Sequence, residues 1–169
     1  MLIIKTVVLG AFVCLALGQS TSPVCFAQTE PTEDKRATQL ANERKKLDRT
    51  TNPQNRAESL MKIAEINLSY IKQAAGANDF PKLESYAVQY QKAVSDAHDA
   101  MMRSGLDPAR KPRGFKNVEI ALRKQIRVLQ DIGRLLTLED RKPIEATLEL
   151  VTQIRADFIQ ALFGGLKTG

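Results

Sequence analysis

The chain has 169 residues, with 25 basic and 19 acidic side chains, a formal net charge of +6, one histidine and two cysteines. This length suits one small domain, and so mild a charge excess is not by itself typical of a nucleic-acid-binding protein. A single histidine excludes a di-iron site built from two Glu-x-x-His motifs and any zinc site that needs several histidines.

Residues 1–27 are predicted to be a secretory signal peptide. A short segment with one positive charge, Lys5, precedes an apolar core at residues 7–18, and Cys25-Phe26-Ala27 offers a cleavage site before Gln28. Cleavage after Gly18 is the alternative. The apolar run is shorter than the roughly 20 residues that span a bilayer. We therefore expect an exported protein, periplasmic or extracellular, with no transmembrane segment after cleavage.

Residues 28–52 are expected to form a flexible lead and a short N-terminal helical arm. The segment 28–34 is polar and contains Pro31, which is typical of a disordered lead. Residues 35–48 are strong helix formers. Their apolar side chains lie on one side of the predicted helix, at Ala37, Leu40, Ala41 and Leu47. Because Arg44 interrupts this stripe, we expect the arm to be weakly docked.

Two helices follow the arm. Asn52 can cap free amides and Pro53 suits the first helical position, so a helix is predicted from Pro53 to about Ala75, with Gly76 as a left-handed stop. Residues 78–81 carry another capping side chain and an early proline. The helix predicted there has apolar residues alternately four and three apart and ends at Gly105. This heptad seam comprises Leu83, Ala87, Tyr90, Val94, Ala97 and Met101.

Two more helices are predicted in the C-terminal part. Residues 106–114 contain two Xaa-Pro pairs and are expected to be a loop. Apolar positions from Phe115 to Leu136 then mark a fourth helix. Residues 137–142 form a turn in which Thr137 or Asp140 can cap a fifth helix. That helix begins near Pro143 and ends at residues 164–165, and residues 166–169 are a disordered tail.

The sum is an all-α fold. Short links between consecutive helices force antiparallel neighbours, so residues 53–165 are predicted to form an up-down antiparallel bundle of four long helices. The bundle consists of two helical hairpins, and the short N-terminal helical arm precedes it. No period-two run of apolar residues appears, which argues against strands.

No constellation typical of catalysis is found. His98 lies in the middle of a predicted helix, and no glycine-rich nucleophile turn occurs in the chain. His98, Met101 and Met102 share one helix face and could in principle hold monovalent copper, but Met101 continues the apolar seam and more simply fills the core. We expect a protein that is not an enzyme, with no catalytic residues, no metal and no cofactor.

The positive charge is concentrated in residues 103–134, which hold nine basic and three acidic residues. Guanidinium groups bind phosphate or carboxylate in a forked geometry, so this segment is a candidate surface for an anion or an acidic partner. The candidate residues are Arg110, Lys111, Arg113, Lys116, Arg123, Lys124 and Arg127. The alternative is a solvated helix face, with some arginines pairing with Glu139, Asp140 and Glu145 across a hairpin.

Nucleic acid is not the expected partner of this segment. Its single aromatic residue, Phe115, belongs to the apolar stripe, whereas a base-stacking surface needs several exposed rings. Phe115 is therefore expected to be buried rather than available to a base.

The leading hypothesis is an exported, non-enzymatic helical binding or scaffolding protein of the bacterial envelope. It would contact another protein through the 35–48 arm or the 103–134 surface. One alternative is a binder of anionic lipid or envelope polymer through the basic segment. Another is a carrier of a metal or small molecule in the bundle interior. An open groove between helices would favour a peptide or helical ligand. The pattern does not specify an oligomeric state.

Overall fold

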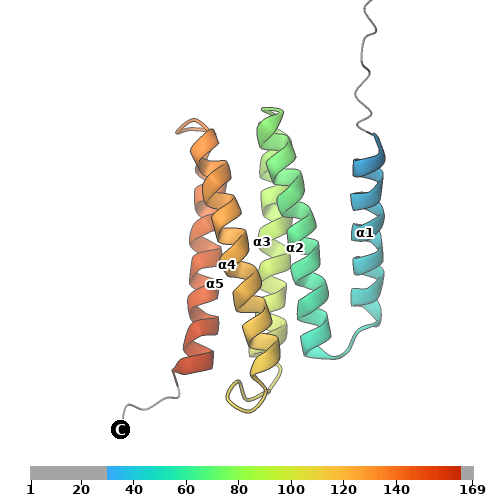
Figure 1. The fold of residues 1–169 in the computed structure, drawn as a ribbon, viewed down its shortest axis with the longest axis vertical. Coiled ribbons are helices and arrows are strands. Elements are labelled where there is room, and N and C mark those ends of the chain that lie inside the picture. The colour runs from blue at the N-terminus through green and yellow to red at the C-terminus, as the bar shows by residue number, and fades with distance from the viewer. Residues whose placement is uncertain (1–29, 165–169) are drawn as a thin grey trace, which may run out of the picture.

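The computed structural model describes residues 30–164, with side chains from residue 35 onward, and these residues form five α-helices (Figure 1). The helices are α1 (Glu30–Arg49), α2 (Pro53–Gly76), α3 (Phe80–Met102), α4 (Pro112–Leu135) and α5 (Lys142–Phe163). No strand occurs among residues 30–164, which confirms the all-α class. The predicted signal peptide and the predicted C-terminal tail lie outside the described residues.

Helix starts follow the capping signals at two of the predicted positions. The Asn52 side chain accepts hydrogen bonds from the amides of Gln54 and Asn55, at 2.9 and 3.1 Å. Asp79 accepts one from the amide of Lys82 at 3.3 Å, and Pro81 lies in the first turn of α3. Both side chains satisfy amides that have no partner inside the helix, and both capping predictions are confirmed.

The predicted helix ends are less accurate. Gly76 is still helical, and the left-handed residue that follows α2 is Asn78, with φ of 54°. Asparagine is among the residues that adopt this region most readily after glycine. Here Asn78 adopts it, and Gly76, two positions earlier, does not. α3 ends at Met102, and Gly105 adopts φ of 68° in the following loop.

Two helices begin at other residues than expected, and α5 begins as expected but without its predicted cap. α4 begins at Pro112 rather than Phe115, because a proline at the first helical position needs no amide partner. α1 begins at Glu30, inside the segment expected to be a flexible lead, and Pro31 then falls in its first turn, where proline is tolerated. α5 begins at Lys142 without a side-chain cap. Thr137 and Asp140 instead hydrogen-bond to each other within the turn.

The helices pack as consecutive antiparallel neighbours. α2 packs along α3, and α4 along α5, so each pair forms a hairpin with a short turn (Figure 1). The hairpins meet where α2 contacts α4 and α3 contacts α5. The central residues of all four helices form one apolar cluster, and every residue of the predicted heptad seam on α3 is buried in it.

α1 contacts only α2 among the described helices. None of its described side chains is buried, and the residues turned toward α2 are Arg36, Leu40, Glu43 and Leu47. Ala37 and Ala41 were expected on this face but are exposed, because two charged side chains pair with α2 and set the rotation of the helix. Arg36 lies over the Tyr70 ring at 4.9 Å and donates to Gln73 at 2.5 Å.

Candidate functional site

The first turn of α4 lies very close to α2 and α3. A Cβ atom at Gly114 would lie 2.8 Å from Cε of Met101 and 2.9 Å from Cγ of Gln54. Real Cβ atoms do not approach neighbours so closely, so the missing side chain lets α4 start against its neighbours. This close approach brings the preceding residue, Arg113, next to α2, where it lines the same concave surface as Gln54.

The basic side chains of α4 project from the side of the helix opposite to its buried stripe. Leu122 and Leu129 are fully buried, whereas the basic side chains between and around them are exposed. Their spacings of three, seven, one and three residues keep all of them within about 100° around the helix axis, on one face. This outer face consists of Arg113, Lys116, Arg123, Lys124 and Arg127.

The remaining two predicted site residues lie at the start of α4. Arg110 is in the preceding loop and Lys111 is the N-cap residue, and both are exposed. Together with Arg113 and Lys116 they line an open depression of about 750 Å³, whose apolar surface comes from Leu106, Pro112 and Ile120. The structure therefore brings four of the seven predicted residues to one depression and carries the other three farther along the same helix.

Most of these cations are not neutralised by neighbours. Arg110 pairs with Asp107 at 3.4 Å, and Arg123 approaches Glu119 at 3.9 Å. Glu119 is held more closely by Arg155 of α5, at 2.9 Å. Among the described residues, the other five form no ion pair: Lys111, Arg113, Lys116, Lys124 and Arg127.

The alternative interpretation included ion pairs from the basic segment to Glu139, Asp140 and Glu145 across the hairpin, and none of these is formed among the described residues. Glu145 instead approaches Arg141 of its own helix at 3.8 Å, and Asp140 is bound by Thr137. The pairs are not formed because the basic side chains project away from the core, whereas these carboxylates lie at the turn and on the first turn of α5. Within the described residues, the ion pair that links α4 to α5 is Glu119–Arg155.

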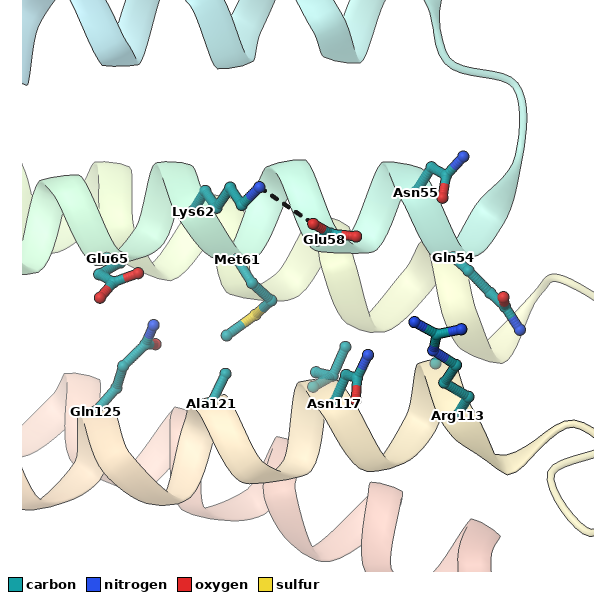
Figure 2. Close-up of a pocket in the computed structure, with 12 residues that line it drawn as sticks. Gln54, Asn55, Glu58, Met61, Lys62, Glu65, Arg113, Asn117, Ala121 and Gln125 are labelled. Atoms are coloured by element: carbon teal, nitrogen blue, oxygen red, sulfur yellow. Dashed lines mark ion pairs between the residues drawn. The ribbon is translucent and has the colours of Figure 1, made fainter.

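A second concave surface runs between α2 and α4, with a volume of about 350 Å³ (Figure 2). Figure 2 shows Gln54 and Arg113 at one end of this groove, Glu65 and Gln125 at the other, and Met61 and Ala121 between them. Met61 and Val118 are buried and form an apolar floor. The walls are polar and come from Gln54, Asn55, Glu58, Lys62, Glu65, Arg113, Asn117 and Gln125.

The groove carries charges of both signs. Glu58 and Lys62 form an ion pair at 3.1 Å. The hydrogen bond and charge of Lys62 lower the pKa of Glu58, with a smaller contribution from Arg113, and Glu58 in turn raises the pKa of Lys62. Both groups are therefore ionised at neutral pH and largely satisfy each other. Arg113 and Glu65, toward opposite ends of the groove, form no ion pair among the described residues.

One residue of the groove wall is hydrogen-bonded from the core side. Gln125 is only 6% exposed, and its Oε1 accepts a hydrogen bond of 2.9 Å from the hydroxyl of Tyr90 on α3. Because the oxygen is occupied on the core side, the amide nitrogen is left to face the groove. Burial raises the pKa of Tyr90, so its hydroxyl keeps the proton that it donates.

His98 contacts two carboxylates. Its Nε2 lies 3.3 Å from Asp157 of α5, its Nδ1 lies 3.6 Å from Asp99, and its ring packs edge-on against Phe158. Asp99 follows His98 directly in the chain, whereas Asp157 is 59 positions away. The contact links α3 to α5. No group of three or more His, Cys, Asp and Glu residues within 30–164 is placed to hold a metal ion.

The sequence did not point to the groove residues on α2. Glu58, Lys62 and Glu65 follow one another at intervals of four and three, which is the ordinary pattern of a solvated helix face. Gln125 did carry a signal, because it is a polar residue between Leu122 and Leu129 on an apolar stripe. Only the packing of α4 against α2 and α3 shows what it contacts.

Comparisons with protein-family models, curated proteins and solved structures find no match for this chain. In the part of the chain that the structure describes, no helix has the length and apolar character needed to cross a membrane.

Proposed function

We propose that this chain is an exported, non-enzymatic helical protein of the bacterial envelope that binds an acidic segment of another protein through the outer face of α4. Export rests on the signal-peptide pattern of residues 1–27. The binding role rests on one observation: five exposed basic side chains of α4 and its N-cap form no ion pair among the described residues.

A rigid platform supports this role. We propose that α2–α5 close into an up-down four-helix bundle with α1 as its arm, because their contacts run in a ring from α2 to α3, α5, α4 and back to α2. α4 belongs to that ring, and its buried stripe fixes the rotation of the helix. Basic side chains on a fixed helix lose less conformational freedom on binding than side chains on a mobile loop.

A protein partner fits this face better than a lipid surface. Helices that lie in a membrane interface bury an apolar face rich in Trp, Phe or Leu among the lipids. The apolar side of α4 is already occupied by the core. The large apolar side chains that the helix exposes are Ile120, Val128 and Leu135, at 39%, 36% and 82%, and they are seven or eight positions apart rather than continuous. An acidic helix or extended segment needs only the row of charges, with local apolar contacts to Leu106 and Ile120.

The test is a crosslinking capture from native envelope extract, with protein purified from cells that express the full chain. One bait carries Lys111, Lys116, Lys124 and Arg127 changed to Glu. A matched control carries the same reversal at three lysines and one arginine that are exposed on other helices, Lys45, Arg49, Lys72 and Lys142. Both variants have the same net charge, so a general loss of positive charge affects them equally.

We expect the wild-type chain and the control variant to capture the same protein, and the α4 variant to lose it. The captured protein should carry an acidic segment, and the complex should weaken steeply as salt is raised, because exposed charges are screened within about 10 Å at 0.1 M salt. Equal capture by both variants would show that the outer face of α4 is only a solvated surface. If no protein is captured, but the wild-type chain binds acidic lipid vesicles and the α4 variant does not, the basic face binds lipid rather than a protein.

A further inference from the structure

We infer that the groove between α2 and α4 is a second binding site, which takes a short peptide with a free amino terminus and a free carboxyl terminus. This site goes beyond the acidic partner proposed for the outer face of α4. The charges of the groove, its amide side chains and its dimensions each support the same ligand.

The charges match a ligand that is itself doubly charged. The groove contains two carboxylates, Glu58 and Glu65, and two cations, Lys62 and Arg113. Glu58 and Lys62 pair with each other at 3.1 Å, which leaves Arg113 toward one end and Glu65 at the other (Figure 2). A simple anion or cation would meet both signs of charge, whereas a zwitterion can place its carboxylate at Arg113 and its ammonium group at Glu65.

The polar walls match a peptide backbone. Four amide side chains line the groove: Gln54, Asn55, Asn117 and Gln125. Each offers donors and an acceptor, as each peptide unit does. Gln125 is the best oriented of them, because Tyr90 occupies its oxygen at 2.9 Å while the side chain is more than nine-tenths buried. Its amide nitrogen is therefore held ready to donate to a peptide carbonyl.

The dimensions set the length of the peptide. Arg113 and Gln125 are twelve residues apart on α4, and a helix rises about 1.5 Å per residue, so the groove extends for about 18 Å. An extended peptide covers about 3.3 Å per residue. Five or six residues therefore cover its full length, and four reach from Glu65 to Arg113 when the long Arg113 side chain extends toward the peptide. The floor of Met61, Val118 and Ala121 is apolar, and the volume of about 350 Å³ favours small side chains on the ligand.

The test uses tetra-alanine and calorimetric titration of the purified full chain. The same peptide is also prepared with its amine acetylated, with its carboxylate amidated, and with both ends blocked. We expect saturable binding of the free peptide. Each single block should weaken it about tenfold, because each removes one charge-assisted hydrogen bond. Absence of binding, or equal binding of the doubly blocked peptide, would overturn the inference.

Two substitutions assign the ends, each with a matched control. Glu65→Gln should remove the preference for a free amine, whereas Glu149→Gln, at an exposed carboxylate of α5, should not. Arg113→Gln should remove the preference for a free carboxylate, whereas Arg127→Gln on the outer face should not. If Glu149→Gln has the same effect as Glu65→Gln, or Arg127→Gln the same effect as Arg113→Gln, tetra-alanine binds elsewhere and the assignment is wrong.

The outer face of α4 and the groove can be tested independently of each other. The variant with Lys111, Lys116, Lys124 and Arg127 reversed should still bind tetra-alanine, since none of these four residues lines the groove. Conversely, Glu65→Gln should still capture the acidic protein partner. A groove that binds no peptide in a chain that captures its partner would overturn this inference alone.

Discussion

The hydroxyl of Tyr90 is a polar group inside the apolar seam of α3. It donates to Gln125 across the contact between α3 and α4, and both side chains are buried. Buried polar groups are stabilising only when their partners are present, since a group left without one keeps the full penalty of lost hydration. The pair therefore links the two hairpins and also orients the groove.

Replacing Tyr90 with Phe should lower the free energy of unfolding by about 1–2 kcal/mol, because Gln125 loses its buried partner. The same variant should bind tetra-alanine more weakly, since the Gln125 amide is no longer held in one orientation. Urea unfolding measures the first effect and calorimetric titration the second. The control is Tyr86→Phe, at a half-exposed tyrosine that stacks on Tyr70. Equal stability losses in the two variants would contradict this role.

Tyr90 also predicts a loss of stability at alkaline pH. Burial raises its pKa well above the ordinary value of 10.0. Above about pH 10 the unfolded chain loses this proton while the folded chain keeps it, so the folded state binds more protons and stability falls as pH rises. The stabilisation is complete below pH 10. We expect Tyr90→Phe to lose less stability than wild type between pH 9 and pH 11, measured by urea unfolding.

At the scale of helices, α2 depends on its cap. Asn52 satisfies two amides of the first turn, and a truncated cap typically lowers stability by about 1 kcal/mol. Asn52→Ala should show this loss in urea unfolding. Thr51→Ala is the control, because Thr51 is exposed and precedes the cap. If the two substitutions have the same effect, the cap does not stabilise α2.

α1 should move independently of the other helices. It contacts only α2 and buries none of its described side chains, and Arg36 provides its main polar contacts, with Tyr70, Ser69 and Gln73. Regions with few buried contacts open locally at low free energy. Arg36→Ala should therefore speed amide hydrogen exchange in residues 35–49 and leave that of α3 and α5 unchanged.

Hydrogen exchange followed by mass spectrometry resolves these segments. Lys35→Ala is the control, because that residue is exposed and adjoins Arg36 on the same helix. Slow exchange throughout α1 in the Arg36 variant would show that Leu40, Leu47 and the Glu43–Lys62 pair hold the arm without Arg36.

For the whole molecule, the question is whether the two hairpins unfold together. Gln91 of α3 donates to Thr147 of α5 at 2.7 Å, and His98 of α3 packs edge-on against Phe158 of α5. Contacts that run between the hairpins in this way favour a single cooperative transition.

The positions of the tyrosines allow this to be tested. All three lie on α2 and α3, and the chain has no tryptophan, so intrinsic fluorescence reports on the first hairpin and, through Tyr90 and Gln125, on its contact with α4. Circular dichroism reports on all the helices. We expect the two signals to change with the same urea midpoint. Separate midpoints would show that the hairpins unfold as independent units.

The elements were largely predictable from the sequence because helix periodicity and caps are local. The seam of α3, the caps at Asn52 and Asp79 and the exposed basic face of α4 all follow from spacing along one helix. The errors at Gly76 and Phe115 lie at helix ends, where neighbouring residues compete for the same conformation.

The groove could not be predicted, because it depends on contacts between residues far apart in the chain. Tyr90 and Gln125 are 35 positions apart, and Gly114 acts through its distance from Met101 and Gln54. The rotation of α1 was predicted only in part: Leu40 and Leu47 face α2 as expected, whereas Ala37 and Ala41 do not. The difference arises because the rotation also depends on the contacts of α1 with Tyr70 and Lys62 of α2.

The measurement that most directly tests the proposed role of the outer face is carbodiimide crosslinking in intact cells, read by mass spectrometry. This reagent joins a lysine amine to a carboxylate in direct contact with it. We predict crosslinks from Lys111, Lys116 and Lys124 to Asp or Glu residues of one other protein, and none to that protein from Lys72 or Lys142, which are equally exposed on other helices. Crosslinks to that protein from Lys72 and Lys142 but not from the α4 lysines, or none from any of the five, would contradict the proposed interface.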